Sequence, residues 1–323
     1  MTLQKPLKLP IARGRKLRPD STVGVIAPGS AVAKEKFESG LTALRARGFQ
    51  VVVPHDPTNN FGRADRGFGS GEAAVRVAAL HTMLRDPAVD VILTARGGYG
   101  TSQILPLVDF DLIRNSKKII VGYSDITALL ANIATRSGLV SVHGAFVGGE
   151  FAREHDDSGA RESVESLLRL LSDEKYLPEL RGESLRDGDG TGWLLPGNLT
   201  MFQTLLGTPW DISFDGAVLL LEEITELPYR VHRALLQLFY AGKFKNLKGL
   251  AFGHFTRCSA PNSPTIESVL RDFVSSELAG LSYPVITGLE VGHEGNNVAL
   301  PIGCRARINN GVLSLVESPI TES

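Results

Sequence analysis

The segment KIIVGYSDITALL, residues 118–130, passes from a continuous apolar run through a small polar pair into a helical pattern. A strand whose residues are all apolar, instead of alternating with polar ones, is typical of a parallel sheet covered on both faces. Comparable units of apolar run, loop and helical pattern begin at Thr22–Ala27, Phe49–Val53 and Val89–Ala95, and Leu139–Val142 adds a further run. Because strands alternate with helices, the N-terminal half is predicted to be an α/β domain on a parallel sheet.

The second half of the chain also combines strands with helices, in a less regular order. Ala217–Leu221 and Leu247–Phe252 are predicted strands, while Pro228–Ala241 and Ile266–Ser276 show helical periodicity. Between the halves, residues 150–190 hold twelve acidic and six basic side chains, which favours a helical linker over a core element. We therefore predict three parts: an N-terminal α/β domain over residues 1–160, a linker over 161–190 and a second, smaller mixed α/β domain over 191–323.

The composition is that of a globular protein and excludes several classes of function. Of the 323 residues, 43% are hydrophobic and 21% are charged, and the net charge of -1 provides no field that would hold nucleic acid or a membrane surface. The two cysteines, Cys258 and Cys304, belong to no CxxC motif or Cys/His cluster, so neither a zinc site nor a disulfide framework is predicted. No apolar run is long enough to span a membrane. A cytoplasmic protein that acts on a small ligand is expected.

The N-terminus is strongly basic. The first 20 residues carry six lysines and arginines against one acidic residue, Asp20. The charge is similar to the start of a secretory signal, but no apolar stretch of about 7 to 15 residues follows it. A solvated N-terminal tail is expected instead.

A glycine-rich loop follows the third predicted strand. In an open parallel sheet, ligands bind beyond the carboxyl ends of the strands. The loop Arg96-Gly97-Gly98-Tyr99-Gly100 has three glycines in five residues, which permits a sharp turn and exposes backbone N–H groups to an anion. It is not a dinucleotide fingerprint, because G-x-G-x-x-G fails after Gly100. An anion cradle and a purely structural turn are both compatible with these residues.

Ser124 stands at the abrupt passage from the fourth predicted strand to a helix over 126–137. Such a position resembles a nucleophile elbow, in which the strand end exposes the serine oxygen and the next N–H faces the place where negative charge develops. The G-x-S-x-G pattern is incomplete, however, because Ile126 replaces its second glycine. Serine is also a routine helix N-cap, and spacing alone favours the cap.

A carboxylate pair and a histidine loop in the second half could complete a catalytic group. Glu222 and Glu223 end an apolar strand, and His293 lies in the glycine-rich stretch 291–297. A serine needs a base to remove its proton, and a histidine serves best when a carboxylate holds its other nitrogen. Two further histidines at strand ends, His143 and His254, remain open alternatives.

These segments together resemble the LD-carboxypeptidases, also called muramoyltetrapeptide carboxypeptidases. The resemblance covers residues 22–305 in the family's order. It rests on Ala95–Gly100, Leu105-Pro106, Asp109–Asp111, Val121–Leu129 and His143-Gly144, and continues through Val25–Ser30, Gly197–Leu199, Gly207–Pro209, Leu221–Glu223, Pro228–Arg230 and Gly292-His293. It outweighs the interpretation of Ser124 as a cap alone.

The resemblance implies a cytosolic serine peptidase that uses neither metal nor cofactor. It implies a flavodoxin-like N-terminal domain with the serine, a smaller C-terminal domain with a glutamate and a histidine, and a homodimer. Ser124 would be the nucleophile, His293 the general base and Glu222 the orienting carboxylate. Glu223 is the alternative to Glu222, because adjacent strand residues point to opposite faces. The N–H groups of Gly98 and Asp125 would form the oxyanion hole.

The implied substrate is a muropeptide from cell-wall recycling, cut at the amide between the L-centre of a diamino acid and terminal D-alanine. Arg96 or Arg230 could hold its free carboxylate, and Asn198 could bind the peptide or cap a helix. A sister group, the microcin-immunity hydrolases, resembles the same pattern and cuts a peptidyl nucleotide. The remaining alternative is a non-catalytic module in which the glycine-rich loop binds an anion.

Overall fold

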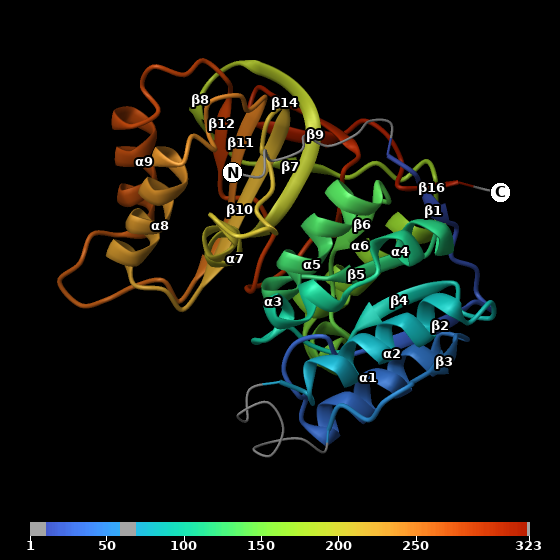
Figure 1. Ribbon diagram of the computed structural model, residues 1–323. Coiled ribbons are helices and arrows are strands. Elements are labelled where there is room, and N and C mark those ends of the chain that lie inside the picture. The colour runs from blue at the N-terminus through green and yellow to red at the C-terminus, as the bar shows by residue number, and fades with distance from the viewer. Residues whose placement is uncertain (1–10, 59–68, 322–323) are drawn as a thin grey trace.

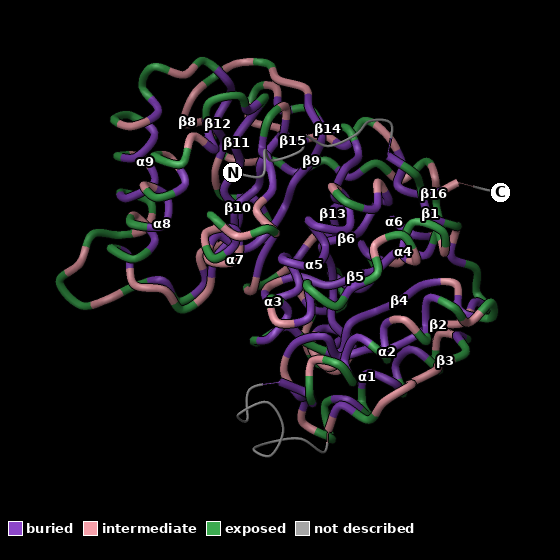
Figure 2. Tube along the Cα trace, viewed as in Figure 1, coloured by how far each residue is buried: buried purple, intermediate pink, exposed green. Residues whose placement is uncertain are grey.

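The structure is a computed structural model that describes residues 11–58 and 69–321, and two sheets with their helices dominate it (Figure 1). The polar, glycine-containing stretch 56–71 lies partly outside the described residues. The first sheet belongs to the N-terminal half and the second to the C-terminal half. Figure 2 shows that the strands of both sheets are largely buried.

The first sheet has the flavodoxin-like strand order. Five parallel strands run in the spatial order β3-β2-β4-β5-β6, which is 2-1-3-4-5 in chain order. The strands are β2 (Thr22–Ile26), β3 (Gln50–Val52), β4 (Val91–Thr94), β5 (Ile119–Gly122) and β6 (Ser141–His143). The predicted fold class is confirmed. In this topology the order reverses between β2 and β4, so ligands are expected at the loops that follow these two strands.

Helices cover both faces of the first sheet, which explains its continuous apolar strands. Ile92 and Ile120 pack in one core with α2, whereas Val91 and Val121 pack in the other with α1 and α6. The helices of this half are α1 (Lys34–Ala46), α2 (Ala73–Arg85), α3 (Thr101–Ile104), α4 (Phe110–Ser116), α5 (Thr127–Asn132) and α6 (Ser158–Ser172), with the shorter turns η2 (Leu105–Leu107), η3 (Ser124–Ile126), η4 (Ile133–Ser137) and η5 (Val147–Phe151).

The second sheet is mixed, with a parallel centre in the order β9-β10-β11-β12 and antiparallel strands at both sides. Its strands are β7 (Glu179–Arg181), β8 (Glu183–Arg186), β9 (Asp189–Asn198), β10 (Ala217–Ile224), β11 (Gly249–Thr256), β12 (Val285–Thr287), β14 (Arg305–Asn309) and β15 (Val312–Leu315). Its helices are α7 (Leu199–Leu205), α8 (Pro228–Tyr240) and α9 (Ile266–Ser276), which lie to one side of the sheet in Figure 1.

The segment 161–190, predicted as a linker, is built into both halves of the fold. In α6, Val164, Leu167 and Leu170 are fully buried against the first sheet. The strands β7 and β8 then form the two opposite edges of the second sheet. The acidic residues of α6, Glu162 and Glu165, are on its exposed face, a pattern in which charge density says little about burial, and Glu150 and Glu154 before the helix are themselves buried.

Segments near both ends of the described chain pack on the N-terminal half. The short strand β13 (Leu300–Ile302) adds an antiparallel edge to the first sheet beside β6. At the other end, β1 (Gly14–Arg15) pairs with β16 (Ile320–Thr321), and Ile11 and Leu17 are buried. The expected solvated tail is therefore wrong for residues 11–17, and residues 1–10 lie outside the described part. Among the described helices, none is long and apolar enough to cross a membrane.

Candidate active site

Ser124 occupies a strained turn directly after β5. Its φ of 58° lies in the left-handed region that residues other than glycine seldom adopt. The turn η3 starts at this residue, and no side chain provides a capping hydrogen bond there. The serine is partly exposed, while Tyr123 and Asp125 on either side are buried. The local geometry is therefore that of a nucleophile elbow and not that of a simple helix cap.

The glycine-rich loop lies against Ser124. A Cβ atom placed on Gly97 would be 3.2 Å from Ser124 Oγ and 2.9 Å from Ser124 Cβ, so only glycine allows this approach. The loop after β2 holds it there, because Ser30 N donates to Gly97 O at 2.9 Å and Tyr99 N donates to Ser30 Oγ at 3.0 Å. Gly98, one candidate oxyanion donor, follows Gly97 in this loop at the switch point of the sheet, and a Cβ there would meet Ser30.

The Asp125 side chain ties the serine turn to this loop. Its carboxylate accepts from the Thr101 N–H at 2.9 Å and from the Thr101 hydroxyl, at the start of α3. Burial raises the pKa of Asp125, and the Thr101 hydrogen bonds oppose that rise. The side chain is therefore structural, and the backbone N–H remains the candidate oxyanion donor.

Glu222 and His293 form a buried pair. Their side chains meet at 2.7 Å between Oε2 and Nδ1, with Glu222 fully buried and the His293 side chain 12% exposed. Burial lowers the pKa of His293, but the charge and hydrogen bond of Glu222 outweigh it, so the pKa is raised. A histidine held in this way presents Nε2 as a base.

Glu223 points to the other side of β10. It accepts from Asn198 Nδ2 at 3.0 Å and from Thr200 N at 2.8 Å, which fastens the start of α7. Burial raises its pKa, and the hydrogen bonds from Thr200 and Ile224 oppose this. Of the two glutamates left open by the sequence, Glu222 is the one that contacts His293.

Close backbone packing positions the histidine loop. Gly292 has a φ of 136°, and a Cβ there would lie 3.3 Å from Glu222 Cβ and 3.2 Å from His254 Cβ. Its N–H donates to Asn297 Oδ1 at 2.9 Å, and His254 N donates to Val291 O at 2.8 Å. The loop is thereby fixed between β11 and its own far end, and His293 faces Glu222.

Tyr123 connects the two halves of the site, and the sequence reasoning missed it. Its ring lies 4.8 Å from the His293 ring and stacks on Phe146 at 4.2 Å. Its hydroxyl donates to Glu150 Oε1 at 2.8 Å, and burial raises its pKa well above the usual value. The elbow and the histidine thus share one aromatic contact. No hydrogen bond joins Ser124 to His293 in the described structure. In the sequence, the only feature that could have identified Tyr123 as a site residue was its position next to Ser124.

The candidate substrate-binding residues differ in how far their side chains are free to contact a ligand. Arg96 is exposed and donates to Ala31 O at 3.1 Å. Arg230 is exposed, lies 3.6 Å from Glu226 and donates to the Tyr229 hydroxyl. Of the two roles left open for Asn198, the structure supports the cap: its Oδ1 accepts from Met201 N at the start of α7, and its Nδ2 donates to Glu223.

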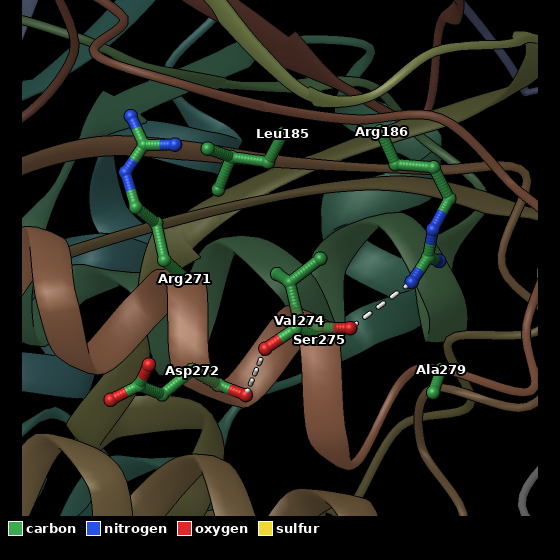
Figure 3. Close-up of a pocket in the computed structure, with 7 residues that line it drawn as sticks. All are labelled: Leu185, Arg186, Arg271, Asp272, Val274, Ser275 and Ala279. Atoms are coloured by element: carbon green, nitrogen blue, oxygen red, sulfur yellow. Dashed lines mark hydrogen bonds between the residues drawn. The ribbon is translucent and has the colours of Figure 1, made fainter.

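Two cavities of the second half differ in their relation to the site. One of about 640 Å³ is lined by Glu294, next to His293, and by His254 and Phe255 at the end of β11. The other, of about 350 Å³, lies between β8 and α9, and no candidate catalytic residue lines it (Figure 3). There Arg186 donates to the backbone oxygens of Val274 and Leu278, a structural role.

Comparison with known proteins finds the same two-part architecture. Residues 23–144 match the LD-carboxypeptidase N-terminal domain, and residues 191–308 match the LD-carboxypeptidase C-terminal domain. The probable murein peptide carboxypeptidase of Bacillus subtilis is 34% identical over 311 residues, which cover 95% of this chain and 94% of that protein.

Solved structures agree on the fold. The muramoyltetrapeptide carboxypeptidase from Oxalobacter formigenes superposes with a TM-score of 0.80 at 30% identity, covering 91% of this chain and 98% of that one. MccF in complex with glutamyl sulfamoyl guanosine superposes with a TM-score of 0.84 at 22% identity, covering 96% of this chain and 100% of that one. The second likeness concerns the fold alone.

Proposed function

The chain belongs to the LD-carboxypeptidase family, and we propose that it is a serine peptidase that removes terminal D-alanine from muramyl tetrapeptides. The bond cut is the amide between the L-centre of the diamino acid and D-alanine. One observation carries the proposal: the buried Glu222–His293 pair lies against Tyr123, the residue before the strained Ser124. A base and a nucleophile from different halves of the chain therefore share one site.

The proposed reaction uses the three residues in sequence. His293 Nε2 takes the proton from Ser124 Oγ as the oxygen bonds to the scissile carbonyl carbon. The N–H groups of Gly98 and Asp125 hold the resulting oxyanion. His293 then gives the proton to the departing amine, D-alanine leaves, and water hydrolyses the acyl-enzyme by the same proton route. Glu222 holds Nδ1–H and stabilises the imidazolium form of His293.

The substrate's free carboxylate needs a cation at the edge of the site. Arg96 is the first candidate, because it lies in the same loop as Gly97 and Gly98 and is exposed. Arg230 is the second, at the first turn of α8. We propose that the enzyme acts on recycled muropeptides in the cytoplasm as a homodimer.

The decisive experiment is D-alanine release from a muramyl tetrapeptide that ends in diaminopimelate-D-alanine, for the wild type and Ser124→Ala, with and without a chelator. Release by the wild type alone, unchanged by the chelator, supports the proposal. Release by Ser124→Ala at more than about a tenth of the wild-type rate would remove Ser124 from the nucleophile role. No release by either protein would refute the muropeptide substrate, and a peptidyl nucleotide would be tested next.

A further inference from the structure

Buried polar atoms without partners occur on Glu222 and on residues in its neighbourhood. Oε2 binds His293, but the buried Oε1 has no hydrogen-bond partner among the described residues. The same holds for both ring nitrogens of His143 and for Asn297 Nδ2. Buried polar atoms are nearly always paired, and an unpaired one is costly, above all on a charged group. One acceptor, Glu222 Oε1, and two kinds of donor, a His143 ring N–H and the Asn297 amide, therefore lack hydrogen-bond partners in the described part of the chain.

His143 stands at the junction of the two halves of the site. It is fully buried at the end of β6, where it pairs with Gly122 on one side and Leu300 on the other. Gly122 lies two residues before Ser124, and Leu300 follows the loop that carries His293. The Tyr123 ring lies 5.4 Å from the His143 ring and 4.8 Å from the His293 ring, so one tyrosine touches both imidazoles.

Asn297 approaches Glu222 from the histidine loop. Only 2% of this residue is exposed, and its backbone N–H donates to Ser163 Oγ at 2.8 Å. Its Oδ1 accepts from Gly292 N at 2.9 Å, and a Cβ on Gly292 would lie 3.3 Å from Glu222 Oε2. With the oxygen committed to Gly292, the Nδ2 donor is the part of the amide that is left for Glu222 and His143.

We propose that neutral His143 and the Asn297 amide are positioning residues that donate hydrogen bonds to Glu222 Oε1, directly or through one bound water. A neutral imidazole carries one N–H, which a carboxylate oxygen can accept. These bonds would hold the carboxylate in place and reduce the negative charge that it presents to His293. Their effect on turnover rests on the proposed peptidase function, whereas the hydrogen bonds themselves do not.

The electrostatics agree with a neutral His143. Burial lowers its pKa to about 4, against the opposing charge of Glu222; the charge of His293 adds to the lowering, and the neighbouring Asn297 side chain opposes it. The other charged groups that face this cluster are Glu223 on β10 and Glu150 on η5, both of which raise the pKa of His293. Glu150 is itself bound by Tyr123 and by Arg153.

The test measures the pKa of His293 by NMR of labelled imidazoles, with its signal assigned from a His293→Gln variant. His143→Leu removes the donors, so Glu222 should act more strongly on His293 and raise its pKa by roughly 0.5 to 1 unit. His143→Gln keeps an N–H donor and should leave the pKa near the wild-type value. Asn297→Asp keeps the acceptor for Gly292 but replaces the donor with charge, and should raise the pKa as well.

His155→Leu, at an exposed position, is the matched control and should change nothing. An unchanged or lowered His293 pKa in folded His143→Leu, or an equal rise in His143→Gln, would overturn the proposal. In parallel, the acid limb of kcat/KM should move to higher pH in His143→Leu. If the His293 pKa shifts as expected but the wild type cleaves no tetrapeptide, the proposed function is refuted while the proposed hydrogen bonds to Glu222 are supported.

Discussion

Ser124 has a positive φ that residues of its type seldom adopt, and this strain has a consequence that can be measured. Strain in a buried, fixed turn persists because the surrounding contacts determine it, and such positions gather at active sites. Here the contacts come from Gly97 on one side and Asp125 on the other. The turn therefore fixes the position of Ser124 Oγ and lowers the stability of the fold in doing so.

Ser124→Gly should stabilise the fold and abolish turnover. Glycine adopts a φ of 58° without penalty, so thermal unfolding should move upward by an amount equivalent to about 1 kcal/mol, while kcat falls by about 10⁴ to 10⁶. Ser124→Ala, which retains the strain, is the control and should lose turnover without the gain in stability. A glycine variant that melts below Ser124→Ala would contradict the account of the strain.

Gly97→Ala should reduce activity more than stability. The added methyl would press on Ser124 at 2.9 to 3.2 Å and displace its oxygen from the productive position, and misplacement of about 1 Å can cost 10²-fold in rate. The control is Gly280→Ala, where a Cβ meets nothing within 4 Å. Equal rates for the two variants would show that the loop does not need this close approach.

The pH dependence follows from the raised pKa of His293. As a base, His293 must be neutral, so kcat/KM should fall as the pH decreases through a value above 6.5. The effect on the free energy of unfolding has the opposite sign. The His293–Glu222 pair stabilises the fold fully below about pH 6.5, and this stabilisation is lost as the pH rises through the higher pKa of His293 in the folded state. Denaturant unfolding at several pH values should show this loss in the wild type and not in Glu222→Gln.

At the scale of elements, α6 supports the loop that carries His293. Ser163 Oγ accepts from Asn297 N at 2.8 Å, and Ser166 Oγ accepts from Ala299 N at 3.0 Å. Gly159, in the first turn of α6, packs against the backbone of Gly295. A helix from the middle of the chain thus fixes the far end of the histidine loop, although it contributes no residue to the chemistry.

Ser163→Ala should weaken both the fold and the site. It leaves the buried Asn297 N–H without its acceptor, which costs about 1 to 3 kcal/mol, and it loosens the loop, so kcat should fall with stability. Ser172→Ala, at the last turn of the same helix, is the control because the Ser172 hydroxyl donates to Leu168 O within that helix. Chemical denaturation and steady-state rates measure both effects. Unchanged kcat in a destabilised Ser163→Ala would limit the role of α6 to the fold.

At the scale of the molecule, the two halves share their hydrophobic cores. Residues of α5 in the first half and of α7 and α8 in the second belong to one buried cluster. Polar contacts reinforce this junction: Thr127 Oγ1 accepts from Asn198 N at 3.1 Å, and Asn132 Nδ2 donates to Trp210 O at 3.1 Å. The proposed triad combines Ser124 of the first half with Glu222 and His293 of the second, so its alignment would depend on this interface.

Arg136→Ala should disturb the relative position of the halves. The guanidinium lies 4.4 Å from the Trp210 ring centre and donates to Pro209 O, so its loss removes a cation–π contact and a hydrogen bond. Unfolding should remain a single transition at lower temperature, and kcat/KM should decrease although Arg136 is remote from Ser124. Arg114→Ala, whose arginine binds only within the N-terminal half, is the control. Normal kcat/KM in Arg136→Ala would show that the interface tolerates the loss.

The sequence alone determined the local units of this protein. Apolar runs identified the parallel sheet, because burial on both faces leaves a pattern along the chain, and glycine and serine at strand ends marked the loops of the switch point. The resemblance to the LD-carboxypeptidases then pointed to Ser124, Glu222 and His293. The burial of α6 within segment 161–190 could not be predicted from the sequence, because an amphipathic helix carries its charges outward whether it links domains or covers a sheet.

The tertiary structure alone decided which of these residues meet. It placed Glu222, and not Glu223, against His293, because a side chain's direction depends on the register of β10 between its neighbours. It used Asn198 as a cap, and it brought Tyr123 and His143 to the histidine from positions remote in sequence. Such contacts depend on how two sheets pack, and packing between distant segments leaves no periodic trace in a single chain.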